Sequence, residues 1–291
     1  MMLLSVLQAN AVVLDVEANL RTMDDAARRA AQEGAGVLLT PELFPCGYAP
    51  ARLRAELDPA RLPGIREHLA GIARRNGIAL VYSLPALTGA ARSAGKDEAG
   101  GEPAWHISAS LVDASGAELL SYAKVHLFGD EERAAFIAAA QPPAVVDFQG
   151  LRTSLLICYD IEFPEAARAA AARGAELLLV PTALSTGFDA VPQVLVRARA
   201  LESQLNIAYA NHCGHEDVYT FGGGSVVAGP DGGLLAQGGT DPDLLFARVD
   251  AAGVRRARKD VPYLRERRPD LYREWEAGLP GAPGRVVDST S

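Results

Sequence analysis

Residues 36–42 have the sequence GVLLTPE, an apolar run that ends at a proline and is followed by a glutamate. A short apolar run closed by proline is typical of a buried strand, because proline cannot donate the next hydrogen bond of a sheet. Upstream, apolar residues recur at helical spacing over residues 16–30, and residues 3–9 form another apolar run. Strand, helix and strand in this order predict two parallel strands joined by a right-handed crossover, and therefore an α/β fold.

The same alternation of strands and helices continues along the chain in two similar sets. Each set ends in a hairpin whose strands flank a turn that contains Asp and Gly. The first set continues with a helix at 64–76, a strand at 78–84 and a hairpin of strands 106–112 and 118–124. The second has strands at 151–157, 176–180 and 207–210, helices at 163–173 and 191–205, and a hairpin of strands 224–228 and 233–237. We interpret the two sets as similar half-layers of one structure.

The domain organisation follows from the absence of a linker. No Pro- or Ser-rich stretch divides the chain, so we expect one domain over residues 1–275 and a C-terminal tail over residues 276–291. Residues 89–101 are rich in Gly, Ala and charge and show no periodicity, which predicts a surface loop.

The composition excludes several classes of protein. The 291 residues are 49% hydrophobic and 22% charged, which is ordinary for a globular protein and excludes wholesale disorder. A net charge of −8, from 28 basic and 36 acidic residues, argues against a nucleic-acid partner. No apolar stretch approaches the roughly 18 residues of a membrane span, and the N-terminus lacks the basic region of a signal peptide. Three cysteines cannot all pair within one chain, which favours a reducing compartment, so we expect a cytoplasmic protein.

Several familiar sites are missing from the sequence. There is no G-x-x-x-x-G-K-[ST] loop, no G-x-G-x-x-G turn after a strand and no G-x-S-x-G elbow. His212, Cys213 and His215 could suggest a metal site, but no second group of ligands has metal-like spacing, and zinc needs three or four ligands. We therefore expect neither a metal nor an organic cofactor.

Three reactive side chains follow predicted strands directly. They are Glu42, Lys124 and Cys158. Ligands of open α/β sheets bind beyond the carboxyl ends of the strands, so the three could meet there. A cysteine near its ordinary pKa of about 8.5 is only a few per cent thiolate at pH 7 and needs a base, and a lysine can stabilise an oxyanion. Each residue alone is more often packing or a solvated charge; the combination is what favours catalysis.

Three segments of the chain resemble a known family. The sequences PELF at 41–44, YAKVHLF at 122–128 and ICYDIEFPE at 157–165 are similar, in order and spacing, to the signature segments of the carbon–nitrogen hydrolase (nitrilase) superfamily. The similarity extends from about residue 3 to about residue 272. The resemblance implies a four-layer α-β-β-α sandwich in which Glu42 is the general base, Lys124 stabilises the oxyanion and Cys158 is the nucleophile.

The resemblance also implies supporting residues. Many members of the family carry a second acid eight positions after the lysine, which is Glu132 here, to hold the lysine and position the substrate. The neighbouring Asp130 and Glu131 leave that register open, and an exposed acidic loop is the alternative. The backbone N–H of Tyr159 is expected to stabilise the oxyanion together with Lys124.

The expected substrates are small aliphatic or amino-acid amides, which would be cleaved to carboxylate and ammonia through a cysteine thioester. The segments resemble the amidase branch of the family, including enzymes similar to 5-aminopentanamidase. An N-carbamoyl amidohydrolase on the same scaffold is the alternative, and a catalytically inactive binding protein is the alternative from another class. The resemblance further implies a homodimer, or a larger assembly of dimers, in which the C-terminal region packs against the partner.

The remaining candidates concern the substrate pocket. Asp160 and Glu162 could attract a substrate ammonium group, or they could brace the turn after the nucleophile. Cys46 is expected to pack near Glu42 or line the pocket, and Cys213 is expected to be structural. The candidate pocket residues are Phe44, Tyr48, Asp160, Glu162 and Phe188.

Overall fold

Two six-stranded β-sheets form the centre of the protein in a computed structural model that describes residues 1–88 and 103–277. The first sheet has the order β14 (Asp243–Val249), β1 (Met2–Gln8), β2 (Val37–Leu39), β3 (Ala79–Thr88), β4 (Ala104–Val112) and β5 (Glu118–Ala123). The second has the order β13 (Leu234–Gln237), β12 (Val226–Ala228), β9 (Asn206–Ala210), β8 (Leu177–Pro181), β7 (Leu151–Leu155) and β6 (Val146–Phe148). The loop predicted at 89–101 and all but two residues of the tail predicted at 276–291 lie outside the described residues.

The two sheets share one topology. Strands β1, β2 and β3 are parallel, and the hairpin β4–β5 continues the sheet antiparallel to β3. Strands β7, β8 and β9 are likewise parallel, and β12–β13 continue antiparallel to β9. One more antiparallel strand closes the other side of each parallel set, β14 beside β1 and β6 beside β7. The interpretation as two similar half-layers is therefore confirmed.

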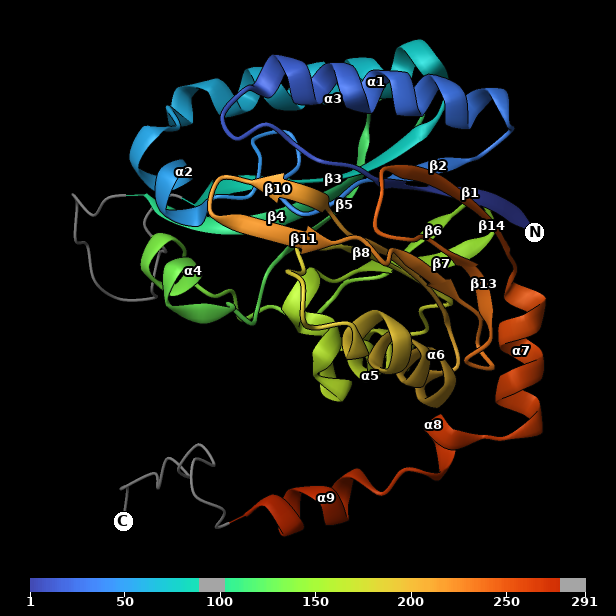
Figure 1. The fold of residues 1–291 in the computed structure, drawn as a ribbon. Coiled ribbons are helices and arrows are strands. Elements are labelled where there is room, and N and C mark those ends of the chain that lie inside the picture. Colours follow the sequence, from blue (N-terminus) through green and yellow to red (C-terminus); the bar gives the residue numbers. More distant parts are fainter. Residues whose placement is uncertain (89–102, 278–291) are drawn as a thin grey trace.

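Helices cover the outer faces of the two sheets. The first sheet carries α1 (Val16–Gln32) and α3 (Leu62–Asn76), and the second carries α5 (Pro164–Ala172) and α6 (Val196–Ser203), as Figure 1 shows. Between the sheets, β1 contacts β9 and both β2 and β3 contact β8. The layers therefore run helix, sheet, sheet, helix, which confirms the four-layer α-β-β-α sandwich.

Local sequence explains why these helices form where they do. Helix α1 begins after Asp15, whose carboxylate accepts a hydrogen bond from the Ala18 N–H at 3.0 Å and so satisfies a free donor of the first turn. Its apolar residues at helical spacing, including Leu20 and Met23, are buried against the sheet. Helix α5 starts with Pro164, which fits a first turn because its missing N–H would have no partner there.

The remaining elements lie outside these four layers. They are α2 (Pro50–Glu56), the 3₁₀ turn η1 (Pro59–Arg61), α4 (Gly129–Ala135), the 3₁₀ turn η2 (Cys158–Glu162), the π-helical turn η3 (Val191–Leu195), β10 (Cys213–Glu216), β11 (Tyr219–Gly222), α7 (Ala251–Asp260), α8 (Tyr263–Glu266) and α9 (Pro269–Glu276). The antiparallel pair β10–β11 forms a separate small ribbon. No helix within the described ranges is long and apolar enough to cross a membrane.

Candidate active site

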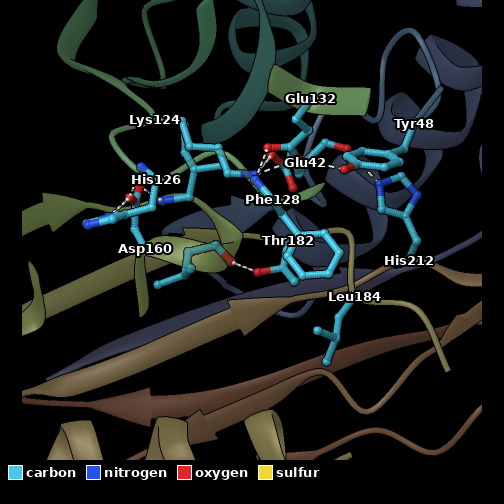
Figure 2. A network of polar contacts seen from close by, with 12 residues as sticks. Glu42, Tyr48, Lys124, His126, Phe128, Glu132, Asp160, Thr182, Leu184 and His212 are labelled. Carbon is cyan, nitrogen blue, oxygen red and sulfur yellow. Dashed lines mark hydrogen bonds and ion pairs between the residues drawn. The ribbon is translucent and has the colours of Figure 1, made fainter. Parts of the chain in front are cut away.

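A buried lysine contacts two buried glutamates between the sheets. The Nζ of Lys124 donates to Oε1 of Glu42 at 2.7 Å and to Oε1 of Glu132 at 2.7 Å. Figure 2 shows the ammonium group of Lys124 pointing toward both carboxylates. All three side chains are essentially inaccessible to solvent, with exposed fractions of 0% for Glu42 and Lys124 and 1% for Glu132. Buried charges persist in proteins when they are paired and hydrogen-bonded in this way.

The ends of strands place Glu42 and Lys124. Glu42 comes three residues after the end of β2, and its N–H donates to the carbonyl of Thr182 at 3.1 Å, which ties it to the end of β8 in the other sheet. Lys124 follows β5 directly, and its N–H continues the pairing with β4 by donating to Ile107 at 2.9 Å. The structure thus brings two of the three predicted side chains, Glu42 and Lys124, into contact beyond the strand ends.

Cys158 begins a tight turn three residues after the end of β7. It opens η2 with a φ of +47°, a left-handed conformation that a non-glycine residue adopts only at some cost in energy. Its side chain is nearly closed off from solvent, at 6% exposed. Burial and the neighbouring Glu42 carboxylate raise the pKa of the Cys158 thiol well above its ordinary value, so the resting group is a thiol that needs a base.

The electrostatics of the cluster suit proton transfer. Burial raises the pKa of Glu42 from 4.5 to about 7. The attraction of Lys124 acts to lower this pKa, and the repulsion of Glu132 acts to raise it. Burial alone would lower the pKa of Lys124, but Glu42 and Glu132 more than offset this and raise it, so the lysine stays protonated. Among the described residues, Oε2 of Glu42 has no hydrogen-bond partner. That oxygen is free to receive a proton, and a pKa near 7 lets the group both accept and return one.

The structure distinguishes Glu132 from its acidic neighbours on α4. Asp130 is exposed and pairs with Arg133, and Glu131 is exposed and accepts a hydrogen bond from the hydroxyl of Tyr219. Glu132 alone of the three is buried, and its Oε2 also accepts the Phe128 N–H at 2.8 Å. The geometry therefore favours Glu132 as the second acid over the exposed-loop alternative.

Two expected pocket residues, Phe44 and Tyr48, are buried. The ring of Phe44 packs against the ring of His212, with centroids 5.5 Å apart, and has no exposed surface. The hydroxyl of Tyr48 donates to Oε1 of Glu132 at 2.6 Å, the same oxygen that Lys124 contacts. Tyr48 therefore supports the polar cluster through Glu132, and Phe44 supports it by packing against His212. Because Phe44 has no exposed surface, it does not form a wall of an open pocket.

Asp160 braces the turn that begins with Cys158. Its Oδ1 accepts the backbone N–H of His126 at 2.9 Å and contacts the ring Nδ1 of His126 at 2.8 Å, while its Oδ2 accepts from the hydroxyl of Tyr122 at 2.9 Å and the N–H of Ile157 at 3.3 Å. The carboxylate is fully buried. Because these donors occupy both oxygens, the geometry corrects the expectation that Asp160 is a pocket residue and favours its role as a brace between the Lys124 segment and the Cys158 turn.

Glu162, at the end of the same turn, is placed differently. Its side chain is half-buried, and the nearby Arg199 contacts the backbone carbonyl of Glu162, with Nη2 at 2.7 Å, not its carboxylate. Within the part of the chain that the structure describes, no hydrogen bond or ion pair reaches the Glu162 carboxylate. Partial burial raises the pKa of Glu162, while Arg199 and Lys124 act to lower it.

An aromatic rim lies beside the cluster. Phe128 and Phe188 are 45% and 46% exposed and meet edge to face, with ring centroids 6.0 Å apart. Tyr159, next to the nucleophile, meets Phe128 edge to face at 5.2 Å. Exposed aromatic surface of this kind is available to an apolar ligand. We call these three residues the aromatic rim.

Sequence reasoning missed two buried residues of the cluster, because it considered His212 only as a metal ligand. His212 and Glu216 flank the start and the end of β10, and both are buried. The ring Nε2 of His212 lies 2.7 Å from the backbone carbonyl oxygen of Glu42, and Nδ1 lies 2.6 Å from Oε1 of Glu216. No periodicity or spacing marked this pair; only the fold brings His212 to Glu42.

The two other cysteines and the possible metal ligands remain to be placed. Cys46 and Cys213 are buried free cysteines, and burial raises the pKa of Cys46 to about 12 and of Cys213 to about 11. Thiols with such pKa values are inert at neutral pH. Among the residues that the structure describes, no group of three or more His, Cys, Asp or Glu side chains is placed to hold a metal ion.

The fold and the site together define a class of protein. A four-layer sandwich that holds a buried carboxylate, a lysine and a strained cysteine near strand ends has the groups that a hydrolase with a cysteine nucleophile needs. The family model described as carbon-nitrogen hydrolase matches residues 3–259, and the chain belongs to that family.

Individual relatives agree with this assignment. An amidase from Nesterenkonia sp. has a crystal structure that superposes with a TM-score of 0.83 and 45% identity, over 94% of this chain and 96% of that one. A Pseudomonas protegens protein described as "Hydrolase in pqqF 5'region" is 37% identical over 265 residues, which cover 89% of this chain and 86% of the relative. Human deaminated glutathione amidase is 30% identical over 270 residues, 89% and 80% of the two chains. The chain is thus an amidase of the nitrilase superfamily, an enzyme that hydrolyses carbon–nitrogen bonds other than peptide bonds.

Proposed function

We propose that this amidase hydrolyses small aliphatic and amino-substituted amides through a Cys158 thioester, with Glu42 as the general base. The observation that carries the proposal is the state of Glu42: a buried carboxylate with one oxygen on Lys124, one oxygen free and a pKa of about 7. A base with a pKa near the working pH is the most effective at both accepting and donating a proton.

The steps follow from these positions. Glu42 accepts the thiol proton of Cys158, and the thiolate attacks the carbonyl carbon of the amide. The ammonium of Lys124 and the backbone N–H of Tyr159 stabilise the negative oxygen of the tetrahedral intermediate. Glu42 then gives its proton to the leaving nitrogen, the C–N bond breaks and ammonia departs. Glu42 next activates a water that hydrolyses the thioester, which releases the carboxylate and restores the thiol.

Glu132 holds Lys124 in this scheme. Its Oε1 accepts from Lys124 and from Tyr48, so the lysine is fixed between two carboxylates and has little freedom to move. A fixed charge stabilises a developing oxyanion without having to reorganise during the reaction. We also propose that Glu132 helps to position the substrate amide.

The aromatic rim supports short apolar acyl groups as substrates. Its exposed rings offer an apolar wall beside the nucleophile. A variant of the Nesterenkonia amidase carries acrylamide added at its active-site cysteine, and another variant carries the acetamide moiety of fluoroacetamide there. Small adducts of this size agree with a site that buries Cys158 almost completely.

We further propose that Glu162 selects amides with an amino group. Its half-buried carboxylate lies on the nucleophile turn and receives no hydrogen bond or ion pair from the described residues. A partly desolvated carboxylate attracts a substrate ammonium more strongly than an exposed one. Amino-acid amides should then react faster than butyramide, and Glu162→Gln should reduce that preference while leaving butyramide turnover within about twofold.

A screen of ammonia release tests the function. The panel comprises amino-acid amides, ω-amino amides, aliphatic amides, nitriles and N-carbamoyl compounds, with release of CO₂ measured for the last group. Cys158→Ala should abolish turnover and leave thermal unfolding unchanged. Undiminished activity of that variant would refute the nucleophile. Release of CO₂ and ammonia from carbamoyl compounds alone would replace the amide proposal with the carbamoyl alternative.

We propose that the protein forms a homodimer through its C-terminal helices. No residue of α8 or α9 is buried, and α9 leads away from the two sheets (Figure 1). Tyr263 and Trp275 expose apolar surface there, and a groove of about 650 Å³ between α6 and these helices includes Leu201 and Tyr272. A second copy of the chain would cover this surface. Light scattering should give twice the chain mass at micromolar concentration, and a monomer would refute the proposal.

A reducing compartment, the cytoplasm, fits the same scheme. Cys158 must stay a free thiol to act, and all three cysteines are free. Cell fractionation should find the protein with cytoplasmic markers.

A further inference from the structure

His212 and Glu216 form a buried pair that contacts the catalytic cluster at the backbone of Glu42 and of Tyr48. His212 has an exposed fraction of 0% and Glu216 of 2%, and the two side chains contact one another at 2.6 Å. The other ring nitrogen of His212 faces the backbone carbonyl oxygen of Glu42 at 2.7 Å. Figure 2 shows His212 and Tyr48 beside one another at this side of the cluster.

The contacts of this pair determine its protonation. A backbone carbonyl can only accept, so Nε2 of His212 must carry a proton to bond Glu42. Oε1 of Glu216 accepts the N–H of Ala11 at 2.7 Å, and Oε2 accepts the N–H of Tyr48 at 3.1 Å. Hydrogen bonds from backbone donors to both oxygens stabilise an ionised carboxylate, so Nδ1 of His212 must donate as well. A ring that donates from both nitrogens is an imidazolium cation.

The pair also closes a ring of buried contacts. From Lys124 the contacts run through Glu132 and the hydroxyl of Tyr48, whose backbone N–H leads on to Glu216. Glu216 leads to His212, whose Nε2 reaches the carbonyl of Glu42, and the Glu42 carboxylate returns to Lys124. One ring of contacts therefore holds the Glu42 carboxylate through Lys124 and the Glu42 backbone carbonyl through His212.

The backbone at Glu42 needs such support. The next residue, Leu43, has a φ of +54°, a left-handed conformation that costs energy for any residue that has a β-carbon. The N–H of Glu42 is held by Thr182, and the bond from His212 holds its carbonyl on the other side of the residue. Charged donors make stronger hydrogen bonds than neutral ones.

We propose that His212, as an imidazolium paired with Glu216, is a positioning residue that holds the Glu42 backbone so that its carboxylate stays between Lys124 and Cys158. This inference rests on the proposed role of Glu42 as the base. His212 acts through Glu42 and does not itself touch the substrate. Its cation also favours the ionised form of Glu42 over the protonated form.

A pair of variants separates the contact to Glu42 from the contact to Glu216. In His212→Asn the side-chain amide can replace Nδ1 but cannot reach the Glu42 carbonyl. In His212→Gln the amide can replace Nε2, so the bond to Glu42 is retained without the cation. We expect kcat to fall about ten- to a hundredfold in H212N with KM within about threefold, and H212Q to recover at least about a tenth of the wild-type kcat. His215→Asn, an exposed histidine on the same ribbon, is the matched control and should keep wild-type kcat.

The pH profile distinguishes positioning from a merely structural role. The charged groups that face His212 and Glu42 are Glu216 from β10, Glu132 from α4, Lys124 after β5 and, when ionised, Cys158 from η2. Removing the His212 cation from this set should move the acid limb of kcat/KM to higher pH in both H212N and H212Q. If the substitutions only reduced the fraction of folded protein, the midpoint of the acid limb would stay at its wild-type pH. That result would overturn the proposal.

Nitrogen NMR on the wild-type enzyme tests the charge without any variant. With ¹⁵N-labelled histidine, one of the five side chains should show both ring nitrogens protonated at pH 8, where an ordinary histidine with a pKa of about 6.5 is neutral. That signal should be absent from H212Q. A neutral ring assigned to His212 at pH 8 would overturn the proposal even if the variants fail to fold. Full activity of Glu42→Gln would instead refute the proposed base and leave the NMR signal unaffected.

Discussion

Glu42→Gln should make the protein more stable at pH 8 while it destroys activity. Glutamine has the shape of the protonated glutamate and carries no charge, so it reproduces the neutral form of Glu42 in the folded state. The folded protein raises the pKa of Glu42 from 4.5 to about 7. Since one pKa unit corresponds to about 1.4 kcal/mol, keeping Glu42 ionised in the fold costs about 3 kcal/mol, which the glutamine variant avoids.

The gain should depend on pH in a defined direction. Below pH 4.5 the side chain is protonated in both the folded and the unfolded chain, so the variant has no advantage. Between pH 4.5 and about 7 the wild-type chain must take up a proton to fold, and the advantage of the variant grows with pH. Above about pH 7 Glu42 is ionised in both states, and the full difference of about 3 kcal/mol remains.

Urea unfolding at pH 5 and pH 8 measures this difference. With a slope of about 3 kcal/mol per M, the variant should unfold at a midpoint roughly 1 M higher at pH 8, and the gain should be much smaller at pH 5. Activity should fall about 10²- to 10⁴-fold at both pH values, because glutamine cannot accept the thiol proton. Glu33→Gln on an exposed residue is the control and should show no such pH-dependent gain. Equal midpoints for E42Q and wild type at pH 8 would refute the claim that an ionised Glu42 is held at a cost.

Three further outcomes follow from the site. The wild-type kcat/KM should rise with pH, with the midpoint of the rise near pH 7, because Glu42 must be ionised to act. Glu132→Gln should lower that midpoint, because it removes the repulsion that Glu132 exerts on ionised Glu42. A stopped assay across pH 5–9 gives both midpoints. Asp160→Asn should cost about 2–3 kcal/mol in urea unfolding, since an amide cannot accept the bonds that both oxygens accept, and exposed Asp147→Asn should cost almost nothing. Phe128→Ala should raise KM for butyramide more than for acetamide, and an equal rise for both would contradict the aromatic rim as an acyl wall.

The sequence predicted the elements that carry the reactive residues. The apolar runs before Glu42 and Cys158 and the hairpin before Lys124 are local signals, and each becomes a strand within a residue or two of the expected bounds. Strand ends are where ligands bind in α/β sheets, which made the three residues candidates, but Glu42 and Lys124 follow strands of one sheet and Cys158 follows a strand of the other, so the packing of the two sheets decides that they meet.

The strands at the far side of each parallel set were not predicted from sequence. Strand β14 pairs antiparallel with β1, so the end of the chain returns to its beginning, and β6 pairs with β7. Strand β6 has only three residues, and nothing within either sequence indicates which strand it joins. Pairing across such a separation is decided by the assembled sheet and not by local propensity.

The contact of His212 with the Glu42 backbone could not be predicted from the sequence pattern for the same reason. His212 and Glu42 are 170 residues apart, and the contact runs from a side chain to a backbone carbonyl, which leaves no trace in residue types. For Asp160 the sequence left two roles open, substrate binding and bracing of the turn, and the structure favours the brace because four donors from the protein already contact its carboxylate.

The buried cluster carries one net negative charge. Glu42, Glu132 and Glu216 contribute three negative charges, and Lys124 and the proposed imidazolium of His212 contribute two positive charges. One negative charge remains, and it lies on the base. When the proton of Cys158 moves to Glu42, that charge moves to sulfur, and the total inside the fold stays the same, so no water has to enter to balance it. Removing one anion at Glu132 and removing the cation at His212 must then shift the acid limb in opposite directions, downward and upward. Shifts of the same sign in the two variants would show that this assignment of charges is wrong.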